Sequence, residues 1–162
     1  MINSFRGRYY FLSTYYECKI SIMGNIYPNA EAAFQAMCCQ YSSDRLEYRH
    51  VTGSEAKKMG RKSWKISDYD YRKDKIMYQV LKEKFKQNGY LRKKLLETYG
   101  EEIAYENTWK DYYWGVCNGY GENVLGKALM RVREELMQRD WITHEYWYVW
   151  NFNWVYKIKY NL

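Results

Sequence analysis

The sequence predicts one mainly helical α+β domain with a few short strands near its N-terminus. The length of 162 residues is typical of a single domain. Aromatic residues make up 20% of the chain, far more than disordered chains contain. Apolar residues recur at helical spacing in several segments after residue 29, whereas β-branched and aromatic residues dominate 5–27. These observations exclude disordered, collagen-like and linker-like chains.

The first elements follow from local signals. Short strands are expected over 5–27, with a turn at 23–25 (Met-Gly-Asn). The next helix can be capped by Asn29 and carries Glu31 in its first turn, where the helix dipole favours a negative charge. Helical spacing predicts that one face of this helix carries Glu31, Phe34, Gln35 and Cys38.

Later segments continue the helical pattern. Ser54 is expected to cap a short helix that ends at Gly60. Further helices are expected over 68–87, 90–99 and 123–137, with a strand over 103–106 and a loop rich in glycine and aromatic residues over 107–122.

The last segment, from Trp141 to Leu162, differs in pattern from the rest. From Phe152 onward, apolar and aromatic residues alternate with other residues, which is typical of a strand with one buried face. Such a strand could extend a sheet edge or contact a second copy. A platform on which single-stranded bases stack is the sharper alternative, with Lys157 and Lys159 beside it.

Charge and cysteine usage narrow the function classes. The net charge of +7 favours phosphate-bearing partners, although a basic solvated surface is also common. The four cysteines form no C-x-x-C pair, and both histidines stand alone, so we expect neither a metal site nor a cofactor. Free thiols suggest a reducing compartment, and no apolar run approaches the length of a membrane span. The expected location is the cytoplasm.

Three groups of residues could support chemistry. Glu31 lies in a mostly apolar helix, so its carboxylate could face a pocket and act as a general acid or base, or simply complement the helix dipole. The segment 106–115, which contains Asn107, Asp111 and Trp114, could hold a flat base and a ribose hydroxyl, or be a packed surface loop. A basic patch could bind phosphate or only be solvated; it comprises Lys57, Lys58, Arg61 and Lys62.

Six segments in a recognisable order resemble the NADAR family, which is typified by the YbiA-like N-glycosidases. They are FLSTYY (11–16), YPNAEAAFQA (27–36), SEAKKMGRK (54–62), DYDYRKDKIMYQVLKEKFKQN (68–88), DYYWG (111–115) and GENVLGKALMRVREEL (121–136). The resemblance implies a YbiA-like domain over 1–138 and an aromatic-rich extension over 139–162, packed on or beside it. It also implies hydrolysis of a C–N glycosidic bond.

The family's substrates suggest two classes of partner. YbiA-like members act on a phosphorylated ribosylaminopyrimidine of riboflavin biosynthesis, and others are linked to NAD and ADP-ribose, including ADP-ribosylated guanine in DNA. Both classes present a base, a ribose and phosphate. The charge and the aromatic extension favour ADP-ribose conjugates, in DNA or RNA, over a small metabolite.

The resemblance also implies residue roles. Glu31 would activate water or stabilise an oxocarbenium-like ribosyl centre, Asp111 would orient the ribose, and Trp114 would stack on the base. The other expected substrate-binding residues are Phe11, Ser13, Cys38, Lys57, Arg61, Tyr69, Asn107 and Asn123, with Tyr69 as the second stacking ring.

Three positions depart from the family pattern. Ala32 follows the glutamate where a histidine is usual, and Tyr69 replaces a tryptophan. Cys38 stands where the family often has a lysine, and a neutral thiol can neither form a Schiff base nor hold phosphate well. A non-catalytic module that binds ADP-ribose or NAD is therefore an alternative to the enzyme. A single-strand nucleic-acid binder that uses the C-terminal segment is another.

Overall fold

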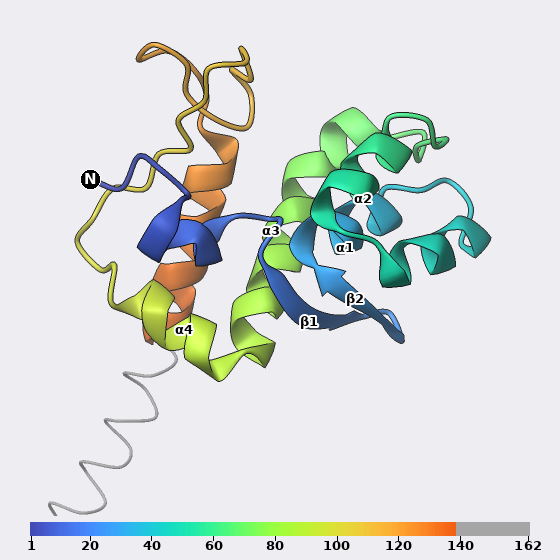
Figure 1. Cartoon of the computed structure of the whole chain (residues 1–162), viewed down its shortest axis with the longest axis horizontal. Coiled ribbons are helices and arrows are strands. Elements are labelled where there is room, and N and C mark those ends of the chain that lie inside the picture. Colours follow the sequence, from blue (N-terminus) through green and yellow to red (C-terminus); the bar gives the residue numbers. More distant parts are fainter. Residues whose placement is uncertain (139–162) are drawn as a thin grey trace, which may run out of the picture.

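The structure, a computed structural model, describes residues 1–138 (Figure 1). The strand and extension expected in the C-terminal segment lie outside these residues. Within them the fold is mainly helical, with one two-stranded antiparallel sheet made of β1 (Glu17–Ile22) and β2 (Asn25–Asn29). The predicted α+β class is therefore confirmed. None of the helices in 1–138 is long and apolar enough to cross a membrane.

The hairpin forms where the sequence predicts it. Ile20 pairs with Tyr27, and both side chains are fully buried. Met23 and Gly24 have positive φ angles of 48° and 77°, which a tight two-residue hairpin turn of this kind requires.

The short strands expected over 5–27 are only partly present, because the residues before the hairpin do not form a strand. Gly7–Leu12 form a 3-10 helix, η1. Phe11 and Leu12 are neighbours in sequence and both are buried. A strand would turn them to opposite faces, so this segment buries both only by curling into a helical turn.

Helix α1 (Ala30–Met37) follows β2 directly, and Asn29 caps it as predicted. The Asn29 side chain accepts a hydrogen bond from the Ala32 amide at 2.8 Å. Every residue from Ala30 to Ala36 is buried. Because the helix has no solvent face over this range, the carboxylate in its first turn is buried too.

Helix α2 (Gly53–Gly60) ends at the predicted glycine, but Ser54 is not its cap. Thr52 is the cap residue. Its hydroxyl accepts from the Glu55 amide at 3.3 Å, while the Glu55 carboxylate accepts from the Thr52 amide at 2.8 Å. This reciprocal capping box satisfies two otherwise free amides, which Ser54, one residue inside the helix, could not do.

Four further helical segments complete the described part of the chain. Helix α3 (Tyr69–Gln87) stops at Asn88, and α4 (Gly89–Leu96) starts immediately after it. A second 3-10 helix, η2 (Ser43–His50), precedes α2. The chain is helical again over 124–138, with a buried apolar stripe of Leu125, Ala128, Leu129, Val132 and Leu136.

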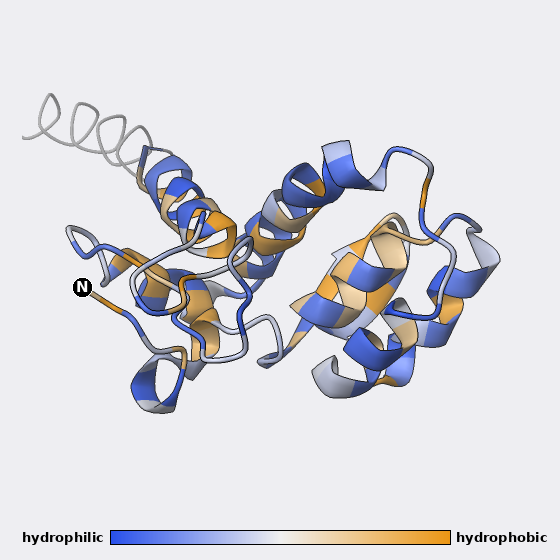
Figure 2. Cartoon of the chain, turned by 90° about the horizontal axis from the view of Figure 1, so that it is seen from above, coloured by the Kyte–Doolittle hydropathy of each residue, from blue (hydrophilic) through white to orange (hydrophobic). Residues whose placement is uncertain are grey.

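Helix α3 lies in the middle of the fold and separates two groups of elements (Figure 1). It contacts α1 and β1 of the first group on one side and α4 of the second group on the other. Apolar residues are concentrated on α1 and on the inner sides of the other helices (Figure 2). The buried residues of both groups belong to one core cluster. This arrangement brings the first residues of the chain and the loop before the last helix close to α1.

The expected strand over 103–106 is wrong. Ile103 and Glu106 each form only an isolated bridge, to Ile2 and Val116. The side chain of Asn123 takes part of the hydrogen bonding that a neighbouring strand would supply, because it accepts from the Tyr105 amide (3.0 Å) and donates to the Ile103 carbonyl (2.9 Å).

Candidate functional site

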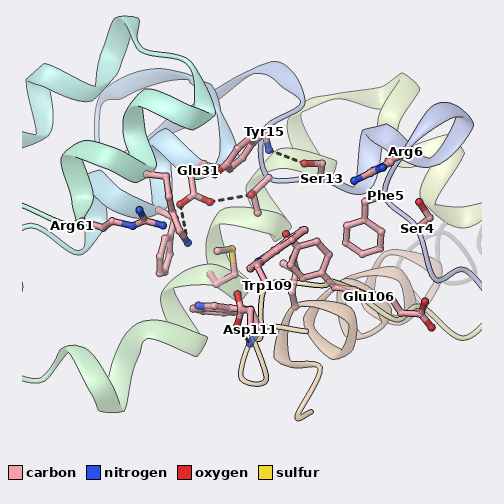
Figure 3. A pocket seen from close by; sticks show the side chains of 17 residues that line it. Ser4, Phe5, Arg6, Ser13, Tyr15, Glu31, Arg61, Glu106, Trp109 and Asp111 are labelled. Carbon is pink, nitrogen blue, oxygen red and sulfur yellow. Dashed lines mark hydrogen bonds and ion pairs between the residues drawn. The ribbon is translucent and has the colours of Figure 1, made fainter. Parts of the chain in front are cut away.

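A cavity of about 410 Å³ opens where α1 and α2 meet the N-terminal segment and the loop before the last helix (Figure 3). The N-terminal segment supplies Ser4, Phe5, Arg6, Ser13, Thr14 and Tyr15, and the helices supply Glu31, Phe34, Lys57, Arg61, Met77 and Leu125. The loop supplies Tyr105, Glu106, Trp109, Asp111 and Trp114. Its walls therefore combine carboxylates, cations and aromatic rings.

Glu31 is the most buried carboxylate in this cavity, at 3% exposed. The Thr14 hydroxyl donates to Oε2 at 2.9 Å, and the Gln35 amide donates to Oε1 at 2.9 Å. The Lys57 ammonium lies 3.6 Å from Oε1. These partners hold the carboxylate in one orientation while leaving it at the cavity wall, as an acid or base in a reaction requires.

A second lysine supports Glu31 indirectly. Lys65 Nζ donates to Gln35 Oε1 at 2.8 Å, and Gln35 Nε2 in turn donates to Glu31 Oε1. Burial lowers the pKa of Lys65 below its usual value. The chain Lys65–Gln35–Glu31 fixes which end of the Gln35 amide faces the carboxylate, because an ammonium can only donate.

Two cations of the expected basic patch reach the cavity: Lys57 from α2 and Arg61 from the position directly after it. Lys57 and Arg61 lie one helical turn apart and both line it. Lys57 is partly occupied with Glu31, whereas the Arg61 guanidinium has no ion pair or hydrogen bond to any side chain within 1–138. Arg61 is therefore available to an anionic group of a ligand.

The cavity wall opposite Glu31 is formed by the loop before the last helix, and hydrogen bonds within the loop hold it in place. Asn107 accepts from the Asp111 amide and donates to the Asp111 carbonyl, both at 2.9 Å. Asp111 Oδ1 in turn accepts from the Trp114 amide at 2.9 Å. The Trp114 ring meets Phe34 edge to face at 5.5 Å, which ties the loop to α1. Asp111 and Trp114 are thus held at the cavity opposite Glu31.

Tyr105 adds a hydroxyl to the site. Burial, with smaller contributions from Asp111, Tyr15 and Glu31, raises the pKa of Tyr105 to about 12. The hydroxyl therefore stays protonated at neutral pH and can donate a hydrogen bond to a ligand.

Six of the residues expected from sequence are brought together at this cavity. They are Glu31, Asp111, Trp114, Ser13, Lys57 and Arg61. The remaining five do not line it. Among these, Phe11 packs in the core, where its ring meets Phe85 edge to face at 6.4 Å. Asn107 and Asn123 are buried and brace the backbone of the loop.

Neither Cys38 nor Tyr69 lines the cavity. Helix α1 ends at Met37, and the Cys38 side chain is fully buried, which raises the pKa of its thiol to about 12. The Tyr69 ring has the ammonium groups of Lys65 and Lys73 at 5.8 and 5.7 Å from its centre. Trp114 lines the cavity and Tyr69 does not, so the base sandwiched between the two rings stays a prediction.

Sequence reasoning missed several lining residues. Thr14 and Tyr15 lie inside the FLSTYY segment, directly after the serine that was expected to bind substrate, so that motif was the available signal. Phe5, Arg6 and Tyr105 belong to no motif. Within 1–138, no three His, Cys, Asp or Glu side chains are grouped so that they could hold a metal ion.

The model of the NADAR domain matches residues 3–137. The chain belongs to the NADAR family. All of the cavity residues described above lie inside the NADAR domain.

Curated relatives are about a third identical to this NADAR chain over the aligned residues. N-glycosidase YbiA of Escherichia coli is 34% identical over an alignment of 126 residues, and the match covers 72% of this chain and 75% of that protein. An N-glycosidase of Nostoc punctiforme is 36% identical and is covered over 79% of its length. A riboflavin biosynthesis protein of Vibrio vulnificus is 36% identical over 135 residues, but the NADAR chain spans only 36% of its length.

The fold agrees as well. The NMR structure of Escherichia coli YbiA matches the NADAR chain with a TM-score of 0.76 and 30% identity, over 86% of this chain and 84% of that one. The expected YbiA-like fold is therefore confirmed.

Proposed function

We propose that this NADAR chain is an N-glycosidase that hydrolyses the C–N bond between a base and a phosphorylated ribosyl or ADP-ribosyl group. The observation that carries the proposal is the buried Glu31 carboxylate, fixed by Thr14 and Gln35 at the wall of a cavity that also holds cations and aromatic rings. The names of its relatives, N-glycosidases among them, support the same reaction.

Glu31 is the acid–base residue of the proposed mechanism. As the bond between ribosyl C1 and the base nitrogen breaks, a water oxygen forms the new bond to C1. Glu31 takes a proton from that water, the leaving nitrogen takes up a proton from solvent, and Glu31 returns its proton to solvent when the products leave. The negative carboxylate also stabilises the oxocarbenium character of C1 in the transition state, as carboxylates do in glycoside hydrolysis.

The other cavity residues would hold the substrate. Asp111, opposite Glu31, would accept hydrogen bonds from ribose hydroxyls, and Trp114 would pack against the base. Arg61 would hold a phosphate, because its guanidinium has no competing carboxylate within the described part of the chain. Asn107 and Asn123 would act by bracing the loop rather than by touching substrate.

We propose two substrate classes for the cavity. One is a phosphorylated ribosylaminopyrimidine, which the name of the Vibrio vulnificus relative favours. The other is an ADP-ribosyl conjugate, including ADP-ribosylated guanine in DNA or RNA, which the charge of +7 and the aromatic composition favour. We place the ADP-ribosyl conjugates first. The four free cysteines fit a reducing compartment, and we propose the cytoplasm.

The test measures base release by mass spectrometry from both substrates. The wild type is compared with Glu31→Gln, whose amide has nearly the same shape and can still bond to Thr14 and Gln35. We expect release from at least one substrate, and at least a hundredfold loss in the variant. Release that the variant retains would contradict the role of Glu31. No release from either substrate, with ADP-ribose still bound, would identify a binding module instead.

A further inference from the structure

A second hollow adjoins the cavity that contains Glu31. It has a volume of about 490 Å³. The cavity that contains Glu31, here the first hollow, shares four wall residues with it, namely Ser4, Arg6, Glu106 and Trp109. Glu31, Lys57 and Arg61 line only the first hollow. In Figure 3, Arg6 and Glu106 lie on the side of the site away from Arg61, and Trp109 lies between. A ligand bound at Glu31 can therefore continue past these shared residues into the second hollow.

Trp109 is held at this junction by a rigid loop. The two Asn107–Asp111 hydrogen bonds close the loop around residues 108–110, and Lys110 adopts a positive φ of 63°. This conformation is unfavourable for a residue with a side chain, so the loop is maintained by its bracing. The Trp109 ring contacts Tyr105 at 6.1 Å, yet it remains 58% exposed. The chain thus presents an open indole surface at a fixed position.

The polar groups of the second hollow suit an uncharged ligand. Arg6 and Glu106 are its single cation and single anion, and the neutral polar side chains of Asn3, Ser4, Thr108 and Asn118 also line it, whereas the Asn107 amide is engaged in bracing the loop. Amides and hydroxyls that surround an exposed indole match a flat group with several donors and acceptors, such as a nucleobase. The Arg6 guanidinium, which has no side-chain partner within 1–138, lies where a phosphate would cross between the hollows.

We propose that the second hollow is a subsite for a second nucleobase, which stacks on Trp109 and is joined through phosphate to the ribosyl group at Glu31. The inference rests on the proposed glycosidase function for its first hollow. It assigns Trp109 and Arg6 as residues that distinguish an extended substrate from a simple ribosyl phosphate.

The test compares the binding of two ligands by NMR titration. Ribose 5-phosphate fills only the first hollow, whereas ADP-ribose carries the same group extended by a phosphate and adenosine. We expect ADP-ribose to bind at least tenfold more tightly. Trp109→Ala should remove most of this advantage, since stacking of one base changes affinity by roughly five- to 150-fold. The same variant should weaken ribose 5-phosphate less than it weakens ADP-ribose, because Trp109 borders both hollows but the second base would stack only on its exposed face.

Trp64→Ala is the matched control. Trp64 is 77% exposed and lines neither hollow, so its loss should leave both affinities unchanged. Arg6→Gln should weaken ADP-ribose more than ribose 5-phosphate. A 5′-phosphorylated dinucleotide, in which a phosphodiester joins the two nucleosides, is the third ligand. A Trp109-dependent gain for it indicates nucleic acid as the source of the base, and a gain for ADP-ribose alone indicates a pyrophosphate-linked nucleotide.

Several results would overturn the subsite. Equal affinity for ADP-ribose and ribose 5-phosphate would do so, as would an equal loss of both in Trp109→Ala or no binding of either at millimolar concentration. The base-release assay with Glu31→Gln is scored separately. If the base is released but ADP-ribose binds no more tightly through Trp109, the glycosidase proposal stands and the subsite proposal is wrong. If ADP-ribose binds more tightly through Trp109 but no base is released, the glycosidase proposal is wrong and the second hollow is still a binding site for an extended ligand.

Discussion

Thr14 and Glu31 are joined twice, once through the backbone and once through their side chains. The Glu31 amide donates to the Thr14 carbonyl at 2.9 Å, and the Thr14 hydroxyl donates to the Glu31 carboxylate at the same distance. The segment that carries Ser13, Thr14 and Tyr15 is therefore attached to the first turn of α1. One contact defines both the position and the orientation of the carboxylate.

Thr14→Val should lower kcat about tenfold with little change in KM. The variant keeps the shape and the backbone bond but leaves Glu31 Oε2 without its hydroxyl donor, at a cost of roughly 1–3 kcal/mol in stability. Thr14→Ser restores the donor and should recover most of the activity. Steady-state kinetics and thermal unfolding of both variants check this. An unchanged kcat in Thr14→Val would show that the hydroxyl does not orient the carboxylate.

Gly60→Ala should disturb the site from outside the cavity. A Cβ at Gly60 would lie 1.9 Å from Gln35 Oε1, so Gln35 must move away from Lys65 and Glu31. We expect a stability loss of about 1–3 kcal/mol and at least a fivefold loss of activity. Gly89→Ala is the control, because its Cβ would meet nothing within 4 Å. Equal behaviour of the two variants in denaturation and turnover would refute the clash.

Lys84 should make stability depend on pH in the alkaline range. It is fully buried, its ammonium donates to the carbonyls of Phe11 and Ser13 at 2.7 and 2.8 Å, and burial lowers its pKa from 10.5 to about 8. Between these values the unfolded chain binds a proton that the folded protein does not, so this contribution to stability rises as pH increases from about 8 to 10.5.

The measurement compares wild type with Lys84→Met in urea unfolding at several pH values. The free energy of unfolding of wild type, relative to the variant, should increase by on the order of 3 kcal/mol over that range. The comparison cancels the titration of groups that both proteins share. A difference that stays flat or falls with pH would show that Lys84 does not titrate as burial predicts.

Cys38 should prove dispensable for turnover. Its side chain is fully buried outside the cavity, and its pKa of about 12 keeps the thiol protonated and unreactive. Cys38→Ala should keep kcat within about twofold. Cys38→Lys should instead destabilise the fold by several kcal/mol, because it buries a second ammonium near Lys65. We would compare iodoacetamide labelling of the native and the denatured protein, and measure the kinetics of Cys38→Ala. A tenfold loss of kcat in Cys38→Ala would show that the thiol takes part in the reaction.

The features that were predictable from sequence depend on neighbours in the chain. Asn29 caps α1 because its side chain reaches an amide three residues away, and α3 stops at Asn88 for an equally local reason. Thr52 was missed as the cap of α2, although the Thr-x-x-Glu spacing with Glu55 carried the signal. Capping of this kind can be read from spacing without knowledge of the fold.

Segments with mixed signals were harder to predict. The aromatic residues before β1 suggested a strand, but η1 buries two successive side chains against α3 and the core. The 103–106 segment also looked like a strand, yet Asn123 takes two of its backbone hydrogen bonds from 18 and 20 residues away. In both cases a tertiary contact outweighed a weak local preference.

The sequence by itself determined the family, the position of Glu31 in the first turn of a capped helix, and the order of the helices, because motifs and caps are properties of neighbouring residues. Only the tertiary structure decided that Thr14, Gln35 and Lys57 surround Glu31, that Cys38 and Tyr69 do not line the cavity, and that Trp109 stands between two hollows. Those outcomes depend on how α1, α2 and the loop before the last helix pack together, and packing is set by shape and burial over the whole domain.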